Sequence, residues 1–202
     1  MQVELKSVSK VFVRNRVLSE VNYTFTSGSK NAILGANGSG KSTLLGVVSG
    51  LILPTSGEVV YSSESETISS DLIYQHLTLS APYLSLTEDF TLLEIIDFHF
   101  KLKESYVKLT NVEFAEKCLF NKNQFGILYK HFSSGMKQRL KLGLAILTKG
   151  DILLLDEPFT NLDVQGKEWC KNLINENLNN RTLLIASNDE EEYEICKDFL
   201  NL

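Results

Sequence analysis

One stretch of this sequence decides the fold: Gly35-Ala36-Asn37-Gly38-Ser39-Gly40-Lys41-Ser42. It has the form G-x-x-x-x-G-K-[ST], in which glycines let the backbone curl so that successive N–H groups face an anion. Residues 31–34 before it, Asn31-Ala32-Ile33-Leu34, predict a short buried strand, and residues 41–51 after it predict a helix whose dipole would favour the anion. A glycine-rich turn is the simple alternative, but this strand and this helix favour a phosphate-binding loop.

The last two residues of this loop have side chains that can bind phosphate and a metal ion. Lys41 would place a positive charge on the β- and γ-phosphates of a nucleotide, and the Ser42 hydroxyl would complete the oxygen ligands of Mg²⁺. The residues that we expect to contact the nucleotide are Gly35, Ala36, Asn37, Gly38, Ser39, Gly40, Lys41, Ser42 and Thr43.

A second pattern is an apolar strand over residues 151–155 that ends in two carboxylates, Asp156 and Glu157. Ligands bind at the C-terminal ends of strands in open α/β sheets. Asp156 would hold Mg²⁺ directly or through water, and Glu157 would orient or deprotonate an attacking water. Taken alone, the pair could equally be a solubilising acidic terminus. The phosphate-binding loop in the same chain favours the catalytic interpretation.

The remaining patterns predict strands that alternate with helices, and therefore an α/β fold with a mainly parallel sheet. Val21, Tyr23 and Phe25 alternate with polar residues, which is typical of a half-buried strand. Residues 76–80 and 182–186 predict further strands. The polar residues 62–70 predict a surface loop.

Helical patterns predict how the chain is organised. Residues 91–148 are helical in pattern, residues 164–178 predict another helix, and residues 189–200 predict a final one. We therefore expect a single domain over residues 1–202 with an inserted helical subdomain at about 84–148.

Composition limits the partners. Lys and Arg number 20 against 25 Asp and Glu, a net charge of -5, which argues against a nucleic-acid binder. Cys118, Cys170 and Cys196 are far apart and predict reduced thiols rather than a disulfide framework or a zinc site. The N-terminus lacks a signal-peptide pattern and no apolar run is long enough to span a bilayer. We expect membrane association only through a partner.

The two motifs and the sequence between them resemble the ABC ATPase family over nearly the whole chain. The family signature has the form L-S-G-G-Q, and residues 132–136 read Phe132-Ser133-Ser134-Gly135-Met136. Ser133 and Gly135 match, whereas Ser134 and Met136 depart. Ser133 can cap a helix expected from about residue 135 to 147. The resemblance implies that these four residues face the γ-phosphate held by a second chain; an ordinary serine-capped helix is the alternative.

The resemblance implies an ATP-hydrolysing subunit with ATP and Mg²⁺ as ligands. Its fold would be a P-loop ATPase core with an antiparallel β subdomain near the N-terminus. Two copies, or one copy with a related ATPase subunit, would associate on binding ATP. They would act in the cytoplasm, on the inner face of the membrane, by driving an integral-membrane subunit through the surface near residues 83–100. The compact length resembles ATPases of haem export, cytochrome c maturation and polysaccharide export.

Two further positions match the family. Phe12 lies where the family stacks an aromatic ring on adenine, although it could be a core phenylalanine. Asp163, in Asn161-Leu162-Asp163, resembles the loop that crosses the dimer interface. It would also serve as the N-cap of the following helix.

Two positions depart from the family. A glutamine usually follows the strand at residues 76–80, but Ala81 or Pro82 stands there, and Gln75 comes too early to substitute. A histidine usually follows the last core strand, where this chain has Asn188. Asn188 could donate to the γ-phosphate, as a catalytic residue beside Lys41 and Glu157, but cannot carry a proton. Alternatively it caps the next helix.

Other functions remain open from the sequence alone. A regulatory ATP sensor that barely hydrolyses is favoured by the two departures and opposed by Lys41, Asp156 and Glu157. A soluble ABC ATPase of DNA repair or translation would usually have a coiled-coil insertion or two nucleotide domains, and this chain has neither. A P-loop kinase or GTPase would not explain the signature at Ser133.

Overall fold

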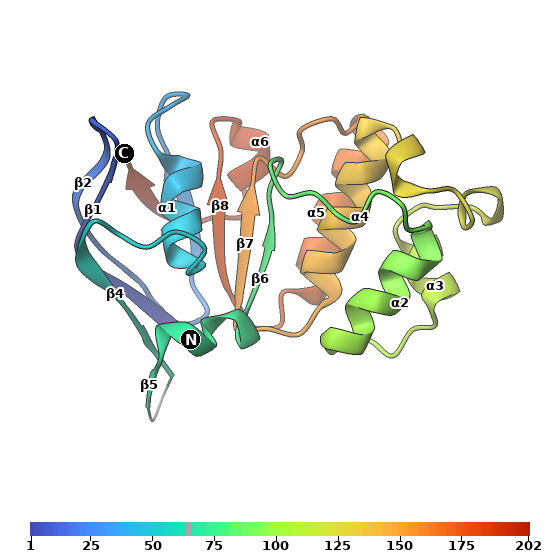
Figure 1. Cartoon of the computed structure of the whole chain (residues 1–202), viewed down its shortest axis with the longest axis horizontal. Helices are drawn as coiled ribbons and strands as arrows, with labels where there is room; N and C mark the ends of the chain where they lie inside the picture. The colour runs from blue at the N-terminus through green and yellow to red at the C-terminus, as the bar shows by residue number, and fades with distance from the viewer. Residues whose placement is uncertain (64–65) are drawn as a thin grey trace. The chain divides into compact units, whose positions relative to one another are not determined.

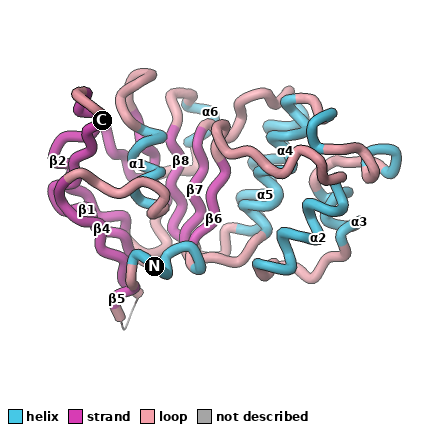
Figure 2. The backbone as a smooth tube through the Cα atoms, in the orientation of Figure 1, coloured by secondary structure: helices cyan, strands magenta, loops and turns pink. Residues whose placement is uncertain are grey.

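The computed structural model describes residues 1–63 and 66–202, which divide into two compact units. The helical insertion expected at about 84–148 falls within the second unit, which Figure 2 shows as mainly helices and loops. The first unit consists of Met1–Leu79, Gly150–Glu157 and Asn180–Leu202, and the second of Ser80–Lys149 and Pro158–Asn179.

An antiparallel sheet in the first unit has the strand order β2-β1-β4-β5. The predicted alternation at Val21, Tyr23 and Phe25 is confirmed as part of a strand, and Phe25 is fully buried. The expected surface loop at 62–70 is wrong in part because a short strand pairs there with β4; residues 64–65 lie outside the described part. The strands are β1 (Gln2–Phe12), β2 (Asn15–Phe25), β4 (Ser56–Ser62) and β5 (Thr67–Ile68).

A five-stranded sheet has the order β6-β7-β8-β3-β9. Its strands β7, β8, β3 and β9 pair in parallel. Figure 1 shows β7 and β8 side by side with α1 next to β8. Because parallel strands end at the same edge, the loops that follow β3, β7 and β8 meet there. The elements are β3 (Lys30–Leu34), α1 (Lys41–Val48), β6 (Leu77–Ser80), β7 (Ile152–Asp156), β8 (Thr182–Ala186) and β9 (Asp198–Asn201).

The final helix expected at residues 189–200 is wrong. The chain forms one helical turn, α6 (Glu190–Tyr193), and then strand β9. Strand β9 pairs with β3 at the sheet edge, where Leu202 N–H donates to the Leu34 carbonyl at 2.9 Å. Hydrogen bonds to an open strand edge satisfy the backbone as fully as a helix would, and here this long-range pairing prevails over local preference.

The core of the first unit fixes the position of helix α1. Apolar side chains from the helix are fully buried against both sheets, so the loop before the helix starts from a rigid base. The main contributors are Leu44, Leu45 and Val48 of α1, Ile33 of β3, Leu154 of β7, Leu184 of β8, and Val3, Leu5 and Phe25 of the antiparallel sheet.

The second unit contains four α-helices and two short 3₁₀ helices, η2 (Lys122–Gln124) and η3 (Tyr129–His131), within the described chain. Thr91 and Thr110 begin α2 and α3 with reciprocal capping boxes to Glu94 and Glu113. Of the described helices, none has the length and hydrophobicity needed to cross a membrane. The three cysteines are buried, and no disulfide joins them in the described chain. The helices are α2 (Leu92–Leu102), α3 (Asn111–Lys117), α4 (Ser134–Leu147) and α5 (Val164–Asn177).

Candidate functional site

The phosphate-binding loop connects β3 to α1 as expected. Gly40, the residue before α1, has a φ of +104°, and a β-carbon there would lie 2.9 Å from the Val17 side chain. Gly35 has a φ of +150°, and its β-carbon would come within 2.8 Å of the Leu202 carbonyl. Both positions therefore require glycine, because of the backbone angle and the lack of space.

Lys41 is held inside the curl of this loop. Its side chain is buried, and its Nζ donates to the carbonyls of Gly35 at 2.7 Å and Ala36 at 3.2 Å. Ser42 is exposed at the start of α1, and Thr43 is half-buried. The ammonium group is therefore fixed close to the backbone that would surround a phosphate.

Asp156 ends β7 and is 2% exposed. Within the described chain, neither of its carboxylate oxygens has a hydrogen-bond partner of good geometry. Burial raises the pKa of this carboxyl group, and the neighbouring Ser42 hydroxyl lowers it in part. A buried carboxylate without a partner is costly. A divalent cation, which prefers oxygen ligands, would stabilise it, so Asp156 and Ser42 fit a Mg²⁺ site.

Glu157 follows Asp156 in an unusual backbone conformation. Its φ is +43°, in the left-handed region that side chains other than glycine rarely adopt, and its N–H donates to the Ala186 carbonyl at 2.9 Å. Such strain persists where the surrounding structure imposes it, and it is concentrated at functional sites. At Glu157 the backbone therefore turns away from the direction of strand β7.

Asn188 contacts the phosphate-binding loop. Its Nδ2 donates to Oδ1 of Asn37 at 2.6 Å, which joins the segment after β8 to the exposed part of the loop. The interpretation of Asn188 as a helix cap is wrong, because Asp189 is the N-cap of α6 and accepts from the Glu191 N–H at 3.0 Å. A role at the phosphate is the interpretation that the contact favours.

We expect Asn188→Asp to fold normally and to lose about nine-tenths of its ATPase activity. Asp189 would still cap α6, but a new carboxylate beside the phosphate-binding loop would repel the γ-phosphate and could not donate to it. Asn188→His should retain or exceed the parent activity, since the imidazole can donate. Steady-state phosphate release of both variants is the measurement. If Asn188→Asp turns over ATP at the parent rate, Asn188 has no part in the reaction.

Phe12 lies at the end of β1 and is 44% exposed. The core interpretation of this ring is therefore wrong. The Nζ of Lys10 lies 4.9 Å from the ring centroid, a cation–π contact. Because Val17 of β2 packs against Gly40, the hairpin that carries Phe12 is in contact with the phosphate-binding loop.

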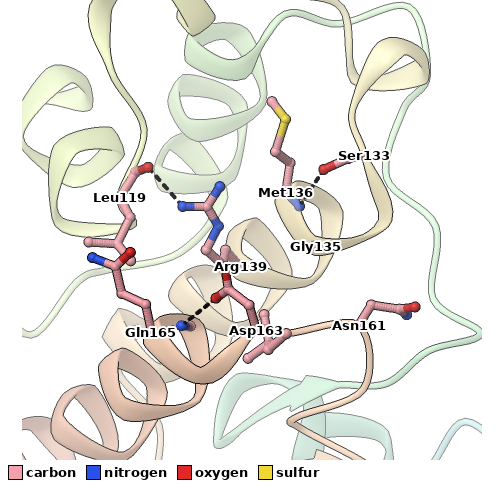
Figure 3. Close-up of a pocket in the computed structure, with 10 residues that line it drawn as sticks. Leu119, Ser133, Gly135, Met136, Arg139, Asn161, Asp163 and Gln165 are labelled. Carbon is pink, nitrogen blue, oxygen red and sulfur yellow. Dashed lines mark hydrogen bonds between the residues drawn. The ribbon is translucent and has the colours of Figure 1, made fainter.

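The signature residues belong to the second unit, and three of them, Ser133, Gly135 and Met136, line a cavity of about 280 Å³ (Figure 3). The Ser133 hydroxyl accepts from the Met136 N–H at 3.2 Å and caps α4, as predicted. Ser134 is exposed at the first position of the helix. Asp163 caps α5, where its Oδ1 accepts from the Gly166 N–H at 2.7 Å. Both expected caps are confirmed, and both open onto the same cavity.

Gly135 contacts the loop that carries Asp163. A β-carbon on Gly135 would lie 2.9 Å from the Asn161 carbonyl oxygen, so only glycine fits. Two further residues near the signature, which were not among the predicted site residues, hold the start of α4 against neighbouring backbone. The Nε2 of buried Gln138 donates to the Pro158 carbonyl at 3.0 Å, and an Arg139 guanidinium nitrogen donates to the Leu119 carbonyl at 2.8 Å. Their position one turn into α4, beside the signature, is the signal that could have identified them.

The segment after β6 contains no glutamine that could replace the one usual in the family. Ala81 is fully buried, and Pro82 is exposed. Gln75 ends the 3₁₀ helix η1 (Ser70–Gln75), before β6, and its Nε2 donates to the hydroxyl of Tyr74 at 3.1 Å. The sequence-based expectation that Gln75 comes too early agrees with this position.

Comparison with known sequences gives a consistent match. The family model for the ABC transporter matches residues 18–160. The chain is 33% identical over 197 residues to the ABC transporter ATP-binding protein YybJ of Bacillus subtilis (strain 168), covering 94% of this chain and 87% of that protein. It is 27% identical to the sulfate/thiosulfate import ATP-binding protein CysA of Pectobacterium atrosepticum, over 97% of this chain, and spans 62% of that protein's length.

Solved structures share the fold. The dimeric structure of MJ0796, described as a bacterial ABC transporter cassette, has a TM-score of 0.83 at 22% identity and covers 99% of this chain and 94% of that one. A second structure of MJ0796, in a dimeric post-hydrolysis state with ADP and Pi, has the same TM-score.

Proposed function

The chain belongs to the ABC transporter family, and we propose that two copies of it hydrolyse ATP in sites shared across their interface to drive a membrane subunit. The observation that carries this proposal is the meeting of Lys41, Asp156 and Glu157 at one edge of the parallel sheet, where Asp156 is buried and neither of its carboxylate oxygens has a hydrogen bond of good geometry within the described chain. The dimeric structure of MJ0796, which shares the fold, supports the association of two copies.

The phosphate-binding loop would hold the triphosphate. Phe12 would stack on the adenine with its exposed ring face. Lys41 would exchange its two carbonyl acceptors for oxygens of the β- and γ-phosphates, which are stronger, charged acceptors. Ser42 and Asp156 would hold Mg²⁺, which supplies positive charge to the β- and γ-oxygens when bound.

Glu157 would orient a water and accept its proton as the water oxygen attacks the γ-phosphorus in line. The bond between the γ-phosphorus and the bridging oxygen breaks, and ADP leaves with that electron pair. Asn188 would donate to the γ-phosphate through the amide that now contacts Asn37. From the second chain, Ser133 and the start of α4 would approach the same phosphate and complete the site.

The surface near residues 83–100 is suited to an apolar partner. Tyr83, Phe98 and Leu102 are 53%, 52% and 69% exposed. Phe98 and Leu102 also line a cavity of about 190 Å³, whose other walls are mainly apolar side chains together with Ser85, Thr87 and His99. Burial lowers the pKa of His99 to about 4, so the imidazole in this cavity is uncharged at physiological pH. An integral-membrane subunit docking here would hold the ATPase on the inner face of the membrane, in the cytoplasm.

Ser133→Asp tests the shared site. Aspartate is as good an N-cap as serine, so α4 should form normally. Its carboxylate would repel a γ-phosphate presented by a second chain, and we expect ATP-dependent dimerisation to weaken at least about tenfold. Light scattering in the Glu157→Gln background, which is expected to hydrolyse ATP slowly, measures this, and Ser56→Asp, at the exposed start of β4, is the control. Undiminished dimerisation of Ser133→Asp would show that the signature does not meet the nucleotide.

A further inference from the structure

A tight turn follows β6 where the family's glutamine is missing. Its ends are joined by a hydrogen bond of 3.2 Å from the Leu84 N–H to the Ala81 carbonyl. Pro82 is at the second position of the turn, where its fixed φ is favourable. Tyr83, at the third position, is 53% exposed. The turn, Ala81–Leu84, is thus short, stiffened by proline, and displays an aromatic side chain.

Helix α4 reaches this turn through Lys141. The Nζ of Lys141 donates to the carbonyl of Ala81 at 2.9 Å and to that of Pro82 at 3.3 Å. Burial, with a contribution from Lys137 one helical turn earlier, lowers the pKa of Lys141. Hydrogen bonds from a charged, partly buried donor are stronger than neutral ones, so the turn is held firmly against the helix.

The same helix begins with the signature, and Lys141 lies near its middle. Ser133 caps α4, and Lys141 lies two turns farther along without interruption. At a rise of 1.5 Å per residue the two positions are about 12 Å apart along the axis. A helix of this length moves as a rigid element, so a displacement of the turn can be transmitted to Ser133.

We propose that Lys141 is a positioning residue that couples the turn Ala81–Leu84 to the signature end of α4. This inference rests on the proposed function, in which Tyr83 belongs to the surface facing the membrane subunit and Ser133 meets the opposite nucleotide. Backbone carbonyls of the turn are bound to the helix directly, so the link needs no side chain from the turn itself. Movement of the partner against Tyr83 would thereby reach the start of α4.

Amide hydrogen exchange of the full chain tests this coupling without ATP. In Lys141→Met, which keeps an unbranched side chain one atom shorter but cannot donate, exchange of the Leu84 amide should rise about tenfold and that of Met136 about threefold. Lys141→Arg should restore both to within about twofold. Lys149→Met, which removes an exposed ion pair with Glu104, is the control and should change neither.

Two outcomes of this experiment would overturn the proposal. One is faster exchange at Leu84 with no change at Met136, which would make Lys141 a local anchor only. The other is a uniform increase that includes β7 and β8, which would indicate lost stability. Because no ATP is used, the result is distinguishable from a failure of the proposed function.

Steady-state kinetics of ATP hydrolysis provide a second test of the role of Lys141. Lys141→Met leaves the phosphate-binding loop untouched, so the KM for ATP should stay within about twofold, whereas kcat should fall about fivefold. Lys141→Arg should recover kcat. An increase in KM at constant kcat would contradict a role in positioning the signature.

Discussion

Replacing Glu157 with glutamine should slow phosphate release by at least about a hundredfold, while ATP still binds. The amide keeps the size and shape of the side chain at the strained turn after β7 but cannot accept the proton of the attacking water. The variant should therefore accumulate a dimer with unhydrolysed ATP. Single-turnover phosphate release, with the retained nucleotide identified by chromatography, measures both effects.

A matched control separates the loss of the catalytic carboxylate from the general effect of removing one negative charge. Glu190→Gln removes an exposed carboxylate from the first turn of α6 and should leave the rate within about twofold. A Glu157→Gln protein that released phosphate at the parent rate would show that another group activates the water.

Replacing Lys41 with alanine should weaken the affinity for MgATP by about a hundredfold or more. The substitution removes the buried ammonium group that now donates to Gly35 and Ala36, and with it the main cation for the β- and γ-phosphates. Titration calorimetry of the purified chain gives the affinity directly. Lys6→Ala, at an exposed position of β1, is the control for the loss of one positive charge.

An unchanged dissociation constant for Lys41→Ala would exclude the loop at residues 35–42 as the phosphate site. Loss of affinity in both lysine variants would point instead to general electrostatic attraction.

The parts of the site that are local in sequence could be predicted. The position of the loop at residues 35–42, between a strand and a helix, follows from its glycines and the patterns around it, and the caps at Ser133 and Asp163 depend on groups three residues away. The strands β7 and β8 can be recognised in the sequence because both of their faces are buried, so each strand is a nearly continuous run of apolar residues.

The parts that depend on distant segments could not be predicted. The local pattern of residues 189–200 predicts a helix. Strand β9 forms there instead, because it pairs with β3, and a pattern of neighbouring residues carries no information on that distant partner. The contact between Asn188 and Asn37, and that between Gly135 and Asn161, join residues far apart in the chain. The exposure of Phe12 was equally hidden, since a phenylalanine at the end of a strand can face either the core or solvent.

If this chain hydrolyses ATP as a dimer, the specific rate of phosphate release must depend on the concentration of the chain. We predict a magnesium-dependent rate per chain that rises with concentration as dimers form, and that EDTA abolishes. A rate no higher than that of Glu157→Gln at every concentration would contradict ATP hydrolysis by a dimer. The protein would then be an ATP-binding sensor.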